Sequence, residues 1–94
     1  MKGSVSRLRV PRDVAELIRG LHPQLKRKVR AALEEMLKDP RTGKALRAEL
    51  AGLWSFRVGK FRLIYRVERR HIGVIAFGPR DRIYEETYRL IARK

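Results

Sequence analysis

The chain lacks cysteine, any long apolar run and any recognisable cofactor motif. Without cysteine it can form neither a disulfide nor a thiolate metal site. No apolar stretch approaches the roughly 18 residues that cross a membrane, and the first residues are polar and basic, unlike the apolar core of a signal peptide. There is no glycine-rich phosphate loop and no metal-ligand spacing. These absences favour a cytoplasmic protein with no metal, no other cofactor and no membrane partner.

Acidic side chains are also scarce. The 94 residues include 24 Lys and Arg but only 10 Asp and Glu, which gives a net charge of +14. Solubility alone rarely calls for more than about eight net charges on a small domain. A chain this basic is expected to bind a polyanion, which is nucleic acid, an anionic membrane or an acidic protein. Its length and its hydrophobic content of 44% predict one domain over residues 1–94 with a single modest core.

The segment 54–67, WSFRVGKFRLIYRV, has the pattern of a β-hairpin. Apolar and polar residues alternate on both sides of a Gly-Lys pair at 59–60, which suits a two-residue type II′ turn. This turn places Arg57 directly opposite Arg62, where like charges are destabilising. Either the two side chains splay into solvent or they share an anion, and the high net charge favours the anion.

Helices and further strands follow from periodicity and from proline. Residues 5–10 alternate as a strand that runs beside the hairpin. Apolar residues at helical spacing predict helices over 11–20 and 23–38, which form an antiparallel helical hairpin, with Leu17 among the residues that face the sheet. Residues 41–53 are expected to be a connection whose leucines pack onto the body.

After the main hairpin, residues 72–77 predict another strand and residues 83–93 a final helix. The inward face of that helix is expected to carry Ile83, Thr87, Leu90 and Ile91. The order β-α-α-β-β-β-α predicts an α+β fold, in which a small antiparallel sheet has the helical hairpin on one face and the C-terminal segment near the other.

The last strand should pair with the hairpin through Val67 and Ile72. Regular pairing from that point sets Leu63 opposite Ala76 on the face covered by the helices. On the other face it sets Arg62 opposite Phe77.

A basic cleft is therefore predicted on the second face of the sheet. Arginine binds phosphate bidentately and stabilises charge that develops on it, but it stays protonated and cannot act as an ordinary base. Lys44, in the connection, either contacts phosphate or is simply solvated. The two histidines, His22 and His71, fall at a helix start and a sheet turn, too far apart to form an acid–base pair. The arginines expected in the cleft are Arg57, Arg62, Arg66 and Arg80.

The runs DPRTGKALRAELAGLWSFRVGKFRLIYRV and IAFGPRDRIYEETYRL resemble the RelE/ParE toxin superfamily of type II toxin–antitoxin systems. The resemblance covers nearly the whole chain and is most specific from residue 39 to residue 67. It implies a RelE-like fold and an acidic antitoxin as partner. In the RelE branch it also implies an mRNA interferase, an endoribonuclease that inhibits translation by cutting mRNA in the ribosomal A site after attack by the RNA 2′-hydroxyl.

The resemblance also implies roles for individual residues. Arg62, Arg80 and Arg57 match the family's catalytic arginines, and its base-stacking tyrosine corresponds to Tyr84 or to Tyr88. We assign Tyr84 to the catalytic group. The residues expected to contact RNA are Lys44, Lys60, Arg66, Arg82 and Tyr88.

The chain departs from the RelE pattern at two positions. Alignment puts Leu53 and Ser55 where RelE carries two lysines, so the identity of the general base is open, with Lys60 in the turn as one substitute. ParE relatives share the fold, lack the nuclease residues and inhibit DNA gyrase. The retained arginines favour an RNase. The alternatives are a gyrase inhibitor and a non-catalytic basic module that binds nucleic acid.

Overall fold

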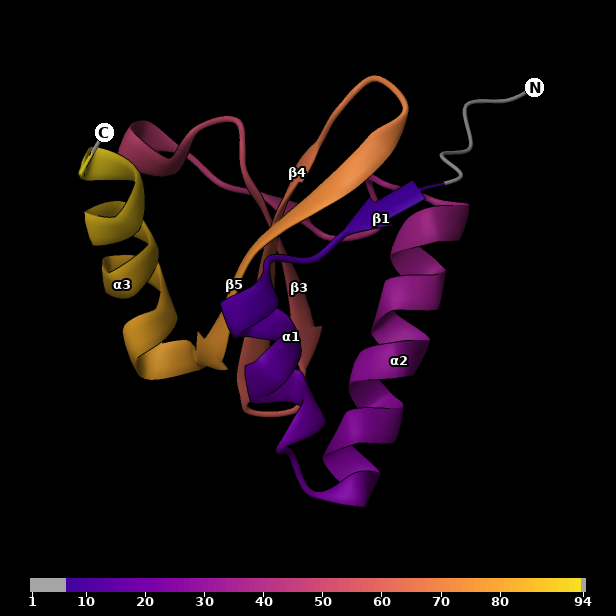
Figure 1. The fold of residues 1–94 in the computed structure, drawn as a ribbon. Coiled ribbons are helices and arrows are strands. Elements are labelled where there is room, and N and C mark those ends of the chain that lie inside the picture. The colour runs from indigo at the N-terminus through magenta and orange to yellow at the C-terminus, as the bar shows by residue number, and fades with distance from the viewer. Residues whose placement is uncertain (1–6, 94) are drawn as a thin grey trace.

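The fold is a five-stranded sheet with helices on both faces, seen in a computed structural model that describes residues 7–93 (Figure 1). The strand order is β1-β5-β4-β3-β2. The predicted α+β class is confirmed, and the predicted elements follow one another in the predicted order, with a short strand and a 3-10 helix in addition between the second helix and the hairpin. The elements are β1 (Arg7–Arg9), α1 (Arg12–Arg19), α2 (Pro23–Lys38), β2 (Lys44–Ala45), η1 (Ala48–Leu50), β3 (Trp54–Val58), β4 (Phe61–Val67), β5 (His71–Pro79) and α3 (Arg80–Ala92).

The β3–β4 hairpin has the predicted register. Arg57 pairs with Arg62, and Val58 pairs with Phe61 across the turn. Gly59 has a φ of 60° and Lys60 is not among the residues with positive φ. A type I′ turn would need positive φ at both loop positions, so a glycine at the first position alone fits type II′.

The pairing of β4 with β5 differs from the prediction because of a β-bulge. Tyr65 pairs with Val74 but Ile64 pairs with Ala76, so Ile75 has no partner on β4. The extra residue moves the rest of β5 by one position and exchanges the faces of its side chains. Every residue from 74 to 77 is apolar, so the sequence pattern could not specify this register.

Two predicted pairs are wrong as a result. Leu63 lies opposite Phe77 rather than Ala76, and Arg62 lies opposite Gly78 rather than Phe77. The Phe77 ring stacks on the Phe61 ring at a centroid distance of 5.1 Å, within the core beneath the helical hairpin. The bulge therefore buries a phenylalanine and leaves a glycine opposite Arg62.

The sheet is mixed rather than purely antiparallel, because β1 pairs with β5 in parallel, with Leu8 opposite Ile72. The predicted strand started at Val5, and residues 5 and 6 lie outside the described residues. The connection 41–53 also contains the two-residue strand β2, which adds to the outer edge of β3. A strand of two residues is too short to show the alternation of polar and apolar side chains by which a strand is predicted from sequence.

The core has two parts, one on each face of the sheet. Beneath α1 and α2 lie the buried residues Val14, Val29, Ala32, Met36, Val58, Leu63, Tyr65, Ile72, Val74 and Phe77. Between the sheet and α3 lie Leu53, Ile64 and Ile83, with Leu46 and Leu50 of the connection packed against them, as predicted. None of the helices among residues 7–93 has the length and apolarity to span a bilayer.

Two leucines predicted to face the core are exposed. Leu17 is 50% exposed and Leu90 is 44% exposed. In α1 the residues that pack on the core are Val14 and Ile18, whereas Leu17 lies at the rim. In α3 the contact stripe runs through Ile83, Thr87 and Ile91 at intervals of four, which leaves Leu90 outside it.

Replacing Leu63 by alanine tests which face of β4 forms the core. Leu63 is fully buried, so we expect Leu63→Ala to lower the free energy of unfolding by about 2–5 kcal/mol. Chemical denaturation measures the change. The matched control is Leu90→Ala, where a half-exposed leucine should cost less than about 1 kcal/mol. Equal losses for the two variants would contradict the assignment.

Candidate functional site

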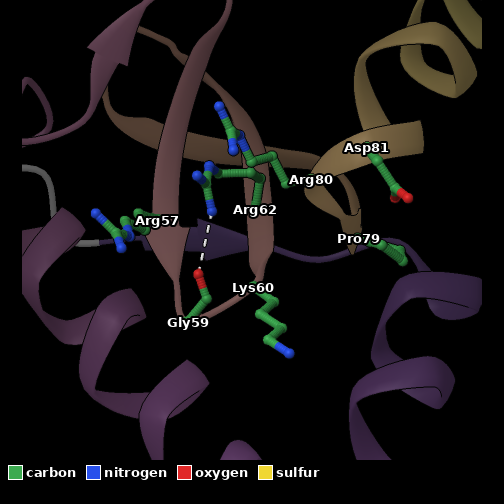
Figure 2. Close-up of a pocket in the computed structure, with 7 residues that line it drawn as sticks. All are labelled: Arg57, Gly59, Lys60, Arg62, Pro79, Arg80 and Asp81. Atoms are coloured by element: carbon green, nitrogen blue, oxygen red, sulfur yellow. Dashed lines mark hydrogen bonds between the residues drawn. The ribbon is translucent and has the colours of Figure 1, made fainter.

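Three arginines from separate elements line the end of the sheet beside the β3–β4 turn. Figure 2 shows that the Arg57 side chain points away from Arg62 and Arg80, so Arg57 borders the hollow from its own side of β3. Arg57 and Arg62 are cross-strand partners, and Arg80 is the first residue of α3. The backbone N–H of Arg80 donates to the carbonyl of Lys60 at 2.9 Å. The start of α3 is thereby held to the hairpin turn, and the position of Arg80 relative to Arg62 is set by backbone rather than by flexible side chains.

These arginines line two adjoining hollows. The first has a volume of about 380 Å³ and also includes Lys60 and Asp81. Figure 2 shows the Asp81 carboxylate directed away from Arg62 and Arg80. The second has a volume of about 390 Å³ and is completed by Lys44, Leu46, Ser55 and Tyr84. We call the two hollows together the arginine cleft.

The Arg62 guanidinium is oriented by the turn. Its Nη1 donates to the carbonyls of Phe61 at 2.8 Å and Gly59 at 3.2 Å. Because Nη1 makes both contacts, the remaining N–H groups of the fork can bind a ligand. Glycine at position 78 faces Arg62 on β5, so no side chain from that strand crowds the guanidinium.

None of the arginines of the cleft forms an ion pair with an acidic side chain among residues 7–93. Among residues 7–93 a single ion pair forms, between Arg89 and Glu85 on the exposed surface of α3. No cluster of His, Asp or Glu in this part of the chain could hold a metal ion. Guanidinium groups that line one cleft without acidic partners repel one another, so the arrangement favours a bound anion such as phosphate.

Tyr84 lies in the arginine cleft and Tyr88 does not. The Tyr84 hydroxyl and the Ser55 Oγ are 3.0 Å apart and share a hydrogen bond. Ser55 is only 5% exposed, so its hydroxyl is held in place and fixes the phenol ring at the side of the second hollow. Tyr88 is one helical turn further along α3 and is 45% exposed.

Lys44 is positioned by a contact between the connection and β4. The buried Tyr65 hydroxyl donates to the Pro40 carbonyl at 2.9 Å and accepts from the Gly43 N–H at 3.1 Å. Burial raises the pKa of the Tyr65 phenol, with the Gly43 hydrogen bond opposing the shift and Asp39 adding to it. The phenol therefore stays neutral, and the residue after Gly43 starts β2 at the edge of the arginine cleft.

Six of the predicted site residues are brought together here. The three arginines Arg57, Arg62 and Arg80 share the arginine cleft with Tyr84, Lys44 and Lys60. The other three, Arg66, Arg82 and Tyr88, are exposed and line neither hollow. The prediction that Arg66 belongs to the same cleft is wrong, because Arg66 lies four residues further along β4.

Sequence reasoning missed the contribution of Ser55 and Gly78. Ser55 alternates with Arg57 on β3 and therefore had to share its face, which was a usable signal. Gly78 faces Arg62 only because of the bulge, and no pattern in the sequence marks that bulge.

Comparison with known proteins points to one family of toxins. A family model described as the ParE toxin of the type II toxin–antitoxin system parDE matches residues 8–84. Toxin RelG of Mycobacterium tuberculosis is 44% identical over 48 residues, which are 50% of this chain and 55% of RelG. The aligned segment thus spans little more than half the length of that relative.

Solved structures of RelE proteins have the same fold. The toxin–antitoxin complex RelBE2 of M. tuberculosis matches with a TM-score of 0.71 at 29% identity, over 84% of this chain and 95% of that chain. A mutant of E. coli RelE in the free state matches with a TM-score of 0.72 at 21% identity, over 90% and 92%. The archaeal RelE–RelB complex of Pyrococcus horikoshii matches with a TM-score of 0.68 at 21% identity, over 83% and 98%.

Replacing Gly43 by alanine tests the contact that positions Lys44. An added Cβ would lie 2.6 Å from the Tyr65 hydroxyl and 2.7 Å from the Ser55 carbonyl oxygen. Since the Ser55 oxygen belongs to the backbone of β3, the clash cannot be relieved by a rotamer change. We expect Gly43→Ala to cost about 1–3 kcal/mol in urea denaturation.

The matched control is Gly73→Ala, in which the added Cβ meets no atom within 4 Å. The urea concentration at the midpoint of unfolding should stay the same or rise for Gly73→Ala, because alanine loses less conformational entropy than glycine on folding. A loss as large as that of Gly43→Ala would mean that crowding at position 43 is not the cause.

Proposed function

The chain belongs to the RelE/ParE toxin superfamily of type II toxin–antitoxin systems, and from that premise we propose that it is a RelE-like endoribonuclease that cuts mRNA in the ribosomal A site. The observation that carries this proposal is that Arg57, Arg62 and Arg80, from three elements, line one hollow beside Tyr84. Such an arrangement suits a single phosphodiester gripped from two sides.

The proposed reaction needs no group beyond the RNA, the protein and water. The 2′-oxygen attacks the adjacent phosphorus, a P–O2′ bond forms and the P–O5′ bond breaks. The 2′-hydroxyl gives up its proton to solvent water and the departing 5′-oxygen takes one from solvent water, which yields a 2′,3′-cyclic phosphate and a 5′-hydroxyl. Negative charge grows on the non-bridging oxygens in the transition state, where Arg62 and Arg80 are placed to stabilise it.

The flanking residues position the RNA. Tyr84 offers a ring for stacking by a base, an interaction worth about 1–3 kcal/mol per base in proteins that bind single strands. The hydrogen bond to Ser55 holds the Tyr84 hydroxyl at the wall of the second hollow. Lys60 lines the first hollow and Lys44 lines the second, so each can contact a phosphate next to the one that is cut.

Catalysis in this chain depends on charge stabilisation. Leu53 and Ser55 carry no amine that could take up a proton. Leu53 is also buried, at 2% exposed, and the Ser55 hydroxyl is already bonded to Tyr84. Neither hollow is lined by a histidine, and the one carboxylate that lines the arginine cleft, that of Asp81, is directed away from Arg62 and Arg80. The arginines would therefore act by stabilising the charge of the transition state.

A second candidate function is inhibition of DNA gyrase. The match to the ParE family model and the absence of lysine at positions 53 and 55 favour it. This candidate predicts loss of gyrase supercoiling activity and accumulation of cleaved DNA complexes, with no cuts in mRNA.

We further propose that the partner that restrains the toxin is an acidic antitoxin. Two of the similar structures are complexes of a RelE protein with its antitoxin. A net charge of +14 would speed association with an acidic protein and make the association rate fall with added salt.

Replacing Arg62 or Arg80 by alanine tests the nuclease. Each change should lower the rate of mRNA cutting by about 10²–10³-fold, because each removes stabilisation of transition-state charge. The double variant should lose less than the product of the two effects, since both side chains act on the same phosphate. Primer extension on mRNA from translating ribosomes measures the cuts, and circular dichroism checks the fold.

Arg93→Ala is the matched control, because it removes the same charge from an exposed position at the end of α3. It should leave cutting nearly unchanged. If all three single variants lose cutting activity equally, total charge explains the activity and the assignment of Arg62 and Arg80 to catalysis is wrong. If wild-type protein makes no cuts but blocks supercoiling, the gyrase function is correct.

A further inference from the structure

A second group of arginines lies at the opposite end of the sheet from the arginine cleft. Figure 1 shows the β4–β5 turn at one end of the sheet and the β3–β4 turn at the other. The arginines around the β4–β5 turn, which we call the distal patch, are Arg7 and Arg9 of β1, Arg66 of β4, and Arg69 and Arg70 of the turn. All five are exposed.

The register of three strands places two of these arginines on either side of a glycine. Arg9 pairs with Gly73, and Gly73 pairs with Arg66 on its other side. Since neighbouring strands are about 4.8 Å apart, the two arginine backbones are roughly 10 Å apart across bare glycine backbone. An added Cβ at Gly73 would meet nothing within 4 Å, so the space between the arginines is open.

Both arginines point away from the helical hairpin. The neighbouring row, Leu8, Ile72 and Val67, packs into the core beneath α1 and α2. Side chains alternate between faces along a strand, so the row of Arg9, Gly73 and Arg66 faces the other way. A phosphate seated over Gly73 would therefore have a guanidinium group on each side.

The distal patch is separate from the arginine cleft but shares its face of β4. Arg66 lies four residues beyond Arg62 on β4, which corresponds to about 13 Å along the strand. One RNA several nucleotides long, or one folded RNA, can therefore contact both sites. The cleft would hold the phosphate that reacts, and the distal patch would hold backbone elsewhere in the same RNA.

The surroundings of the distal patch favour RNA over a protein. Stable protein interfaces depend on buried apolar and aromatic anchors. The large hydrophobic residues that are exposed among residues 7–93 are Leu17, Tyr88 and Leu90, all of which lie on α1 or α3. A surface that offers charge and open backbone without an apolar anchor suits a phosphodiester chain, which is bound largely through release of counterions.

We propose that the distal patch binds the phosphodiester backbone of structured RNA through Arg9 and Arg66. It thereby holds the protein on its RNA-containing target independently of the arginine cleft. The proposal rests on the proposed function only in its choice of RNA as ligand.

Salt dependence of RNA binding tests the proposal. The probe is a fluorescent RNA hairpin long enough to reach both ends of the sheet, and the protein carries Arg62→Ala so that the probe stays intact. Adding Arg9→Ala and Arg66→Ala should reduce the slope of log K against log salt by about 1.4–1.8, at about 0.7–0.9 per lost phosphate contact. Fluorescence anisotropy across a potassium chloride series gives the slopes, and circular dichroism checks the fold.

The matched control adds Arg27→Ala and Arg30→Ala, which remove two exposed charges from α2. In this control, the slope of log K against log salt should change by less than half as much as in the variant with Arg9→Ala and Arg66→Ala. Equal changes in the two variants, or no change in the distal variant, overturn the proposal. Unchanged RNA binding together with weakened binding of the antitoxin would identify the distal patch as a protein surface and would also overturn it.

The same set of measurements separates this proposal from the nuclease. If wild-type protein makes no cuts in mRNA but the distal variant still shows the reduced slope, the nuclease function fails and the RNA-binding distal patch stands. If the cuts occur but the slope does not depend on Arg9 and Arg66, the nuclease stands and the distal patch fails.

Discussion

The pairing of Arg57 with Arg62 across the β3–β4 hairpin is the constraint on which the functional surface depends. Once Gly59 forms the turn, the register sets the backbones of two arginines opposite each other. The same turn supplies the Gly59 and Phe61 carbonyls that orient Arg62, and the Lys60 carbonyl that holds the start of α3. The cleft is therefore built from one turn, and a change in its length would displace all three arginines.

The bulge at Ile75 decides which residues of β5 lie opposite the arginines of β4. Arg62 and Arg66 are four residues apart on β4, whereas the residues opposite them, Gly78 and Gly73, are five apart on β5. The extra residue in β5 lets a glycine face each arginine. A regular strand would have set Phe77 beside Arg62 and filled the space that a phosphate needs. The bulge thus buries Phe77 and opens the cleft in one step.

Most of the fold could be predicted from the sequence because its signals are local. The type II′ turn, the helical periodicity of α2 and the prolines at residues 11, 23 and 40 fix element type and hairpin register without reference to the rest of the chain. The bulge, the parallel pairing of β1 and the strand β2 depend on contacts between distant segments. The part of the cleft that follows from the hairpin register, Arg57 opposite Arg62, could be predicted. Arg66 was wrongly included because the face of the sheet on which a residue lies does not say how far along the strand a site extends.

The unpaired charge of the protein links its fold to its partners. One surface ion pair forms within residues 7–93 although the chain carries a net charge of +14, so repulsion among the arginines lowers the stability of the free protein. A polyanion that binds the native surface removes that repulsion and stabilises the fold by mass action. An acidic antitoxin and an RNA target both meet this description. The two would then compete for the same uncompensated charge, and an antitoxin that covers the arginines would inhibit the toxin while it stabilises the fold.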